Sequence, residues 1–160
     1  MRHIATIGVY GFTADTFVEE LTRANVRLLL DLRQRRGVRG PEYAWANAVR
    51  LQAVLAAAAV EYRHVPGLAP TTELRRLQYR ADDRAGVGKR NRVALAPEYA
   101  TGYTREILDP FDLGALVAEL PEGTTALFCV ERDPEACHRS LVADRLHAER
   151  GLRVTHLRPR

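Results

Sequence analysis

The stretch from Thr124 to Leu146, TTALFCVE-RDPEA-CHRSLVADRL, predicts a strand that passes through a polar turn directly into a helix. The apolar run 126–130 lies between Gly123 and a charged turn, which is typical of a buried strand. Asp133 is a suitable N-cap, and Pro134 fits the first helical position, where its missing N–H costs nothing. The sequence therefore predicts a strand-to-helix crossing whose helix starts at the proline.

Strand and helix patterns alternate along the rest of the chain. The expected strands are 3–9, 26–32, 61–65 and 153–157, and the expected helices begin at Thr13 or span 43–60, 71–80, 97–108 and 111–120. This alternation implies crossover units and a single-domain, three-layer α/β sandwich of the Rossmann-like kind. We expect a mostly parallel sheet of about five strands with helices on both faces. One domain then spans 1–160, with an irregular insertion around 67–96.

Length and composition describe an ordinary globular chain. With 160 residues, 46% apolar and 28% charged, the chain can bury a core of its own. No apolar run approaches the roughly 20 residues that cross a bilayer, and the N-terminus lacks the features of a secretion signal. Two cysteines separated by a charged turn favour reduced thiols and a cytoplasmic location without a membrane partner. Composition says nothing about the oligomeric state.

The basic character comes almost entirely from arginine. Lysine and arginine together number 24, of which only Lys89 is lysine, and the net charge is +4. Guanidinium groups match phosphate oxygens in bidentate fashion, so a phosphate-bearing partner is one interpretation. A bias toward arginine on an ordinary solvated surface is the other. The loop 33–41, RQRRGVRGP, concentrates four arginines, including Arg39, without an acidic residue.

The polar residues of interest follow the ends of the predicted strands. Tyr10 follows the first strand, Asp31 and Arg33 end the second, and 129–137 follows the fourth. In open parallel sheets, ligands bind outside the carboxyl ends of the strands. We therefore expect a binding site at this edge of the sheet.

Cys137 and Glu131 are the candidate catalytic residues. A thiol in the first turn of a helix, next to His138 and Arg139, has a stabilised thiolate and can act as a nucleophile. The alternative is a small buried residue, which is also the interpretation we favour for Cys129. Glu131 can transfer a proton, or it can pair with an arginine (Arg139 or Arg33) and hold the turn.

An anion site is predicted at the same helix start. Arg139 and His138, together with free N–H groups of residues 135–137, favour a phosphate or carboxylate. Asp31 and Arg33 point to the same side of their strand, so a buried ion pair should position the arginine at the site. The turn lacks the glycines of a dinucleotide fingerprint, and the Cys and His spacing matches no common zinc pattern, so no metal or cofactor is expected.

Tyrosines can line the pocket and stack on a ring. Tyr10 follows the first strand, while Tyr99 and Tyr103 lie four positions apart on one predicted helix. The same spacing is equally typical of a core stripe. Tyr10 and Tyr103 are retained as ligand-binding candidates.

At this point the chain resembles a known family. The runs TIGVYG, LLLDLR, HVPGL and VTHL, and above all CVERDPEACHR at 129–139, resemble the domain of unknown function 488 family. The resemblance covers nearly the whole chain. It implies a compact α/β domain and carries no assigned activity.

Three functions are compatible with these patterns. The leading hypothesis is an enzyme, or a degenerate enzyme, that binds a phosphate-bearing small molecule of the nucleotide or nucleobase type at the strand ends. The second is a nucleic-acid-binding module that grips phosphates with the loop 33–41 and the region 75–92. The third is a thiol-based redox sensor. Arginines that converge into a cleft favour the first, and arginines spread along an outer face favour the second.

Overall fold

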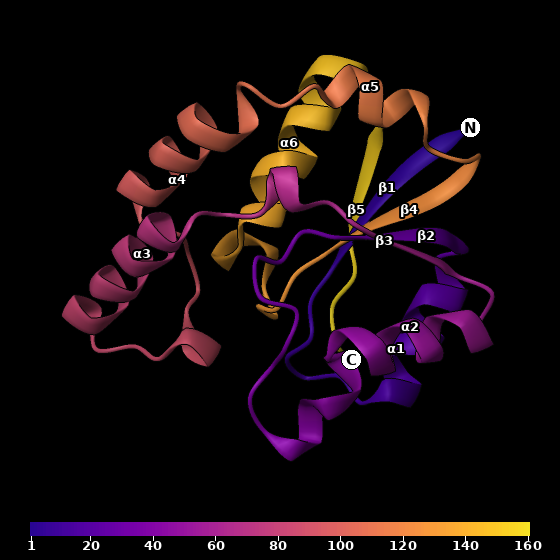
Figure 1. The fold of residues 1–160 in the computed structure, drawn as a ribbon, viewed down its shortest axis with the longest axis horizontal. Coiled ribbons are helices and arrows are strands. Elements are labelled where there is room, and N and C mark those ends of the chain that lie inside the picture. The colour runs from indigo at the N-terminus through magenta and orange to yellow at the C-terminus, as the bar shows by residue number, and fades with distance from the viewer.

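The computed structural model describes the whole chain, residues 1–160, except the side chain of Lys89. Its centre is one sheet of parallel strands in the order β3-β2-β4-β1-β5 (Figure 1). The strands are β1 (Arg2–Ile7), β2 (Val26–Asp31), β3 (Glu61–His64), β4 (Gly123–Phe128) and β5 (Arg153–His156). The predicted α/β fold with a parallel sheet is confirmed.

Helices cover both faces of the sheet. α1 and α2 pack on one face and α3 to α6 on the other (Figure 1). The helices are α1 (Ala14–Arg23), α2 (Ala48–Ala57), α3 (Thr72–Ala85), α4 (Pro97–Tyr103), α5 (Leu113–Ala118) and α6 (His138–Arg150). Shorter 3₁₀ turns lie at Pro41–Ala46, Pro66–Leu68, Lys89–Asn91 and Pro134–Ala136, and a π-helical turn follows α4 at Thr104–Leu108.

Alternating side chains of the strands fill two separate cores. In β2, Leu28 and Leu30 pack with the helices α3 to α6, while Leu29 packs with α1 and α2. This is the period of two that extended backbone imposes. Since both faces of the strand are buried, its sequence is an almost continuous apolar run, as in most parallel sheets.

The helix after β4 begins later than the sequence predicted. Pro134–Ala136 form a separate 3₁₀ turn, and Cys137 is extended (φ −139°, ψ 147°) as the N-cap of α6. The Asp133 side chain pairs with Arg158 at 3.1 Å instead of capping a helix. The expectation that Cys137 lies within the first helical turn is therefore wrong, because this residue directly precedes that turn.

Two other helices differ from their predicted bounds. The helix expected over 43–60 is interrupted at Asn47, which is extended (φ −68°, ψ 142°) and accepts a hydrogen bond from the Val38 N–H through Oδ1 at 2.8 Å. The helix expected over 71–80 continues to Ala85, so much of the region 67–96 is regular.

The carboxyl ends of the three central strands are tied together by main-chain hydrogen bonds. Val9 N–H donates to Val130 O at 2.9 Å, and Leu32 N–H donates to Phe128 O at 2.9 Å. In the strand register, Phe128 faces both Ile7 and Asp31. The loops that follow β1, β2 and β4 therefore leave the sheet at one place.

The closest approach at this edge is made by Gly8. A Cβ at this position would overlap the main-chain carbonyl of Glu131. We expect Gly8→Ala to lower the free energy of unfolding by about 1–3 kcal/mol, which is the usual cost of overpacking. Urea denaturation measures it. At Gly88 a Cβ would meet nothing within 4 Å, so Gly88→Ala is the matched control, and equal stability of the two variants would contradict the close approach.

Candidate functional site

A cleft opens where the loops after β2 and β4 face α3 and the segment 92–99. Its volume is about 60 Å³. Cys129, Glu131, Cys137 and His138 all line it. The structure thus brings both candidate catalytic residues to the carboxyl edge of the sheet, in one cavity wall.

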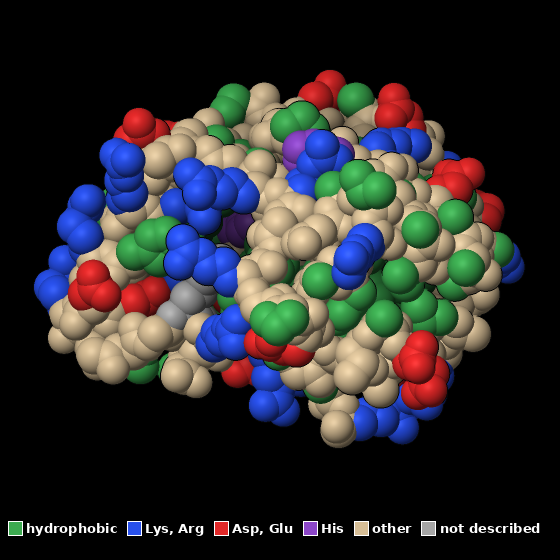
Figure 2. Space-filling view, turned by 60° about the horizontal axis from the view of Figure 1, so that its bottom comes forward, with side chains coloured by type: hydrophobic (Ala, Val, Ile, Leu, Met, Phe, Trp, Pro, Cys, Tyr) green, Lys and Arg blue, Asp and Glu red, His purple; other side chains and the backbone are tan. Residues whose placement is uncertain are grey.

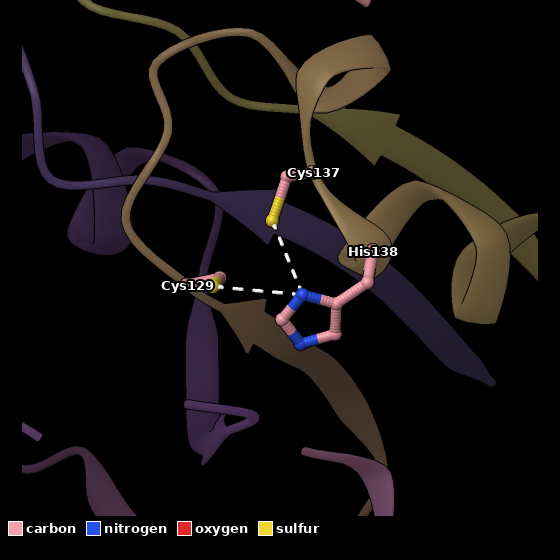
Figure 3. A group of neighbouring side chains, drawn as sticks. All are labelled: Cys129, Cys137 and His138. Atoms are coloured by element: carbon pink, nitrogen blue, oxygen red, sulfur yellow. Dashed lines mark hydrogen bonds between the residues drawn. The ribbon is translucent and has the colours of Figure 1, made fainter. Parts of the chain in front are cut away.

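Two cysteines and one histidine form the centre of this wall (Figure 3). The Nδ1 atom of His138 lies 3.8 Å from the Sγ atoms of both Cys129 and Cys137. Cys129 directly follows β4, Cys137 caps α6, and His138 is the first residue of that helix. All three are buried, and both thiols are free. The strand-to-helix crossing places these three side chains together although the turn between them is seven residues long.

The imidazole of His138 is held from its other side. Its Nε2–H donates to the main-chain oxygen of Leu32 at 2.9 Å, at the end of β2. A carbonyl oxygen can only accept, so this bond fixes the proton on Nε2. In the neutral ring the lone pair of Nδ1 then points at the two sulfur atoms, and in the protonated ring an Nδ1–H points at them.

The pKa values of the two thiols are shifted in opposite directions. Burial raises the pKa of Cys137, but a hydrogen bond from Cys129 and the positive charge of His138 and Arg139 outweigh it and hold this pKa well below its usual value. The same thiol–thiol hydrogen bond, with burial, raises the pKa of Cys129 well above its usual value. Burial lowers the pKa of His138, yet the Cys137 sulfur raises it overall. Cys137 is therefore the more acidic of the two thiols.

Glu131 is held by an arginine that the sequence did not single out. Arg92 donates to Glu131 Oε1 at 3.1 Å and to Asp82 at 2.7 Å, and all three side chains are buried. Arg92 also donates to Ala136 O at 3.2 Å, within the turn that precedes α6. The carboxylate pairs with neither Arg33 nor Arg139, the two partners expected. Only the general emphasis on the region 75–92 pointed to Arg92, because its partners Glu131 and Ala136 are 39 and 44 positions away in the sequence.

The expected pair of Asp31 and Arg33 is present. The guanidinium of Arg33 donates to both carboxylate oxygens of Asp31 at 2.9 Å and to Ala46 O at 2.9 Å. Its CZ atom lies 4.7 Å from the centre of the Phe128 ring. Tyr62 donates a further hydrogen bond to Asp31 at 2.6 Å. Arg33 contributes to the cleft wall, but its N–H groups are used to join β2 to the Pro41–Ala46 turn.

Arg139 does not reach the cleft. Its side chain is fully buried, and it donates to the main-chain oxygens of Glu131 at 2.7 Å and of Arg132 at 3.2 Å. The N–H groups of Ala136 and Cys137, expected to be free, donate to Asp133 O and Pro134 O. Arg139 and two of the three N–H groups expected to bind an anion are therefore used within the turn itself.

This structural role makes a prediction for Arg139→Met. The variant keeps an apolar stem but removes two donors from buried carbonyls, each worth about 1–3 kcal/mol when left unsatisfied. We expect the free energy of unfolding, measured by urea denaturation, to fall by about that amount for each bond lost. The affinity for anions, measured by calorimetry, should not change. Undiminished stability together with lost anion binding would return Arg139 to the ligand site.

The remaining candidates divide between the core and a second groove. Tyr103 is fully buried, donates to Leu68 O at 2.6 Å and stacks on Tyr99 with ring centres 6.2 Å apart, so it belongs to the core stripe. Tyr99 lines the cleft, whereas Tyr10 and Arg39 line a neighbouring groove.

The neighbouring groove is larger and basic. It has a volume of about 930 Å³, and Arg35, Arg39, Arg75 and Arg90 line it. Arg35 and Arg75 also line the cleft, so the two spaces lie side by side. Figure 2 shows Lys and Arg side chains gathered around a hollow on this side of the molecule. The arginines thus converge into a concave surface.

The acidity difference between the thiols gives a second prediction for the site. Since the thiolate is the reactive form, iodoacetamide should modify Cys137 faster than Cys129 at neutral pH. The rate at Cys137 should also stop rising with pH earlier, because its pKa is the lower of the two. Peptide mass mapping over a pH series measures both. Equal and slow labelling at every pH would mean two unreactive core thiols.

The fold and this site define an α/β protein with a cavity at the carboxyl edge of a parallel sheet. The family model named "Domain of unknown function DUF488" matches residues 13–146. The chain belongs to this family. Neither a curated protein nor a solved structure matches the chain significantly. No helix within the described part of the chain is long and apolar enough to cross a membrane.

Proposed function

We propose that this protein is an enzyme whose cleft binds a phosphate-bearing small molecule of the nucleotide or nucleobase type. One observation carries the proposal. The Cys137–His138 pair lies in the wall of a cleft that is also lined by two arginines, neither of which pairs with a carboxylate among the described residues. A nucleophile and a cationic anchor are thereby within reach of one small ligand.

Arg35 and Arg75 are the anion-binding groups of this proposal. Arg35 is exposed and forms no ion pair with any described residue. Arg75 is half-buried, and its partners are the neutral groups Gln34 Oε1 and Tyr79 OH, both at 2.9 Å. A guanidinium that is already oriented by neutral partners keeps its charge for a phosphate and loses little entropy when it binds one. These two residues replace Arg33 and Arg139 in the anion site.

Three residues of the cleft wall receive catalytic roles in this proposal. The Cys137 thiolate attacks an electrophilic carbon or phosphorus atom with its lone pair, and the leaving group departs with the bonding electrons. His138 supplies the proton that the leaving group needs. Glu131, next to Arg92, accepts the proton of the water that releases the product from sulfur. Tyr79 and Tyr99 line the cleft beside these groups, and aromatic side chains suit a flat base.

Anion affinity tests the proposal. We expect phosphate or a mononucleotide to stabilise the wild type in thermal-shift assays. Arg35→Ala and Arg75→Ala should each weaken binding by about tenfold or more, since a charged hydrogen bond is worth about 1.5–3 kcal/mol. Arg76→Ala is the matched control, because Arg76 is exposed on the same helix and lies outside the cleft lining. A wild type that no phosphate compound stabilises would refute the proposal.

The basic groove favours a nucleic acid as the second candidate ligand. A single-stranded oligonucleotide therefore belongs in the same panel. Binding of the oligonucleotide alone would identify the nucleic-acid module, with log affinity falling by about 0.7 per phosphate contact against log salt concentration. In that case Arg39→Ala, in the groove but outside the cleft, should weaken binding as much as Arg35→Ala.

A further inference from the structure

The three side chains at the centre of the cleft wall have the spacing of a metal centre. Nδ1 of His138 and the Sγ atoms of Cys129 and Cys137 all lie within 4.8 Å of one another. Each sulfur–nitrogen distance is 3.8 Å. In a tetrahedral zinc site, with Zn–S near 2.3 Å and Zn–N near 2.0–2.1 Å, the sulfur and nitrogen atoms stand about 3.6 Å apart. A contraction of a few tenths of an ångström would bring each sulfur–nitrogen distance to this value.

The histidine is already oriented for coordination. Metal-binding histidines almost always donate their other N–H to a carbonyl or carboxylate, which fixes the tautomer and the ring direction. Here Nε2–H donates to Leu32 O, and the lone pair of Nδ1 is aimed between the two sulfur atoms. This hydrogen bond is the feature of a metal site that packing of two cysteines and a histidine does not require.

The ligand set also selects the kind of ion. Two sulfur ligands and one imidazole suit zinc and other soft transition-metal ions, whereas magnesium and calcium require oxygen. Two thiolates neutralise a divalent cation, and both lose their protons to solvent on binding. All three ligands line the cleft, so an ion can enter from it and would have an open position toward it. Three protein ligands with an open position are typical of catalytic rather than structural zinc sites.

We propose that Cys129, Cys137 and His138 bind a zinc-type transition-metal ion whose fourth coordination position is open to the cleft. The earlier expectation of no metal considered spacing along the chain alone, and that spacing does not reveal that the end of β4 faces the start of α6. The inference is independent of the phosphate ligand. A sulfur bound to an ion is not a free nucleophile, so the loaded and metal-free forms are two distinct states of the same cleft.

Cobalt substitution provides the direct test. The wild-type chain is stripped with a chelator under reducing conditions and titrated with Co²⁺. We expect one equivalent to bind, with thiolate-to-cobalt charge-transfer absorption in the near ultraviolet and the intense visible bands of tetrahedral cobalt. Zn²⁺ should displace it, since zinc binds such ligands more tightly than cobalt does. One equivalent of Zn²⁺ should also abolish the iodoacetamide labelling of both cysteines.

Variants assign the ligands. Loss of a residue that only hydrogen-bonds a metal ligand typically weakens metal binding by about 10–100-fold. Cys129→Ser, Cys137→Ser and His138→Gln remove a ligand atom itself, so each should weaken Zn²⁺ binding by more than this. The glutamine keeps a donor for Leu32 O and removes the ligand nitrogen. His147→Gln is the matched control, because His147 lies exposed on the same helix, and its affinity for Zn²⁺ should equal that of the wild type.

The cobalt spectrum of the wild type tests the metal site even if a ligand variant fails to fold. A cobalt complex without thiolate charge transfer, or unchanged labelling of both cysteines in saturating Zn²⁺, would overturn the metal site. Equal loss of affinity in His147→Gln would also overturn it. Arg35→Ala and Arg75→Ala separate the two proposals: they should retain the cobalt spectrum and lose only the response to phosphate. Failure of either proposal is then visible without the other.

Discussion

The two hydrogen bonds from Arg139 to the main-chain oxygens of Glu131 and Arg132 hold together the turn on which the site depends. They join the first turn of α6 to the loop that leaves β4, so both ends of the crossing have a fixed separation. Cys129 and Cys137 can therefore face a common histidine. Because this guanidinium is fully buried and bound to main-chain oxygens, its role is to hold the turn together.

Arginines in this protein have two distinct roles, and burial separates them. Arg33, Arg92 and Arg139 are all buried and bind carboxylates or main-chain oxygens, at the ends of β2, before α4 and at the start of α6. A buried guanidinium is costly unless it is paired or hydrogen-bonded, and each of these three is held by such bonds to the turns around it. Arg35 and Arg75 lie at the cleft without a carboxylate partner among the described residues. The net charge of +4 does not distinguish the buried arginines from those at the cleft.

The fold was predictable because its signals are local. The apolar run 126–130, the strand 26–32 and the alternation of strands and helices all depend on near neighbours, and the parallel sheet follows from them. The start of α6 was misplaced because a side-chain contact, Asp133 with Arg158, removes the expected N-cap. Arg92 and Glu131 are 39 positions apart, so no local sequence pattern predicts the hydrogen bond between them. The cavity residues were therefore found only in part.

The hydrogen bond from His138 to Leu32 O has a further consequence for exchange with solvent. A main-chain carbonyl cannot take up the Nε2 proton, so the imidazole cannot relay protons through its far side. The two sulfur atoms and the ring are otherwise enclosed, with side chains at most 6% exposed. Protons and ions consequently enter and leave the group through the cleft alone. A molecule bound in the cleft therefore closes the route by which these three side chains exchange protons with solvent.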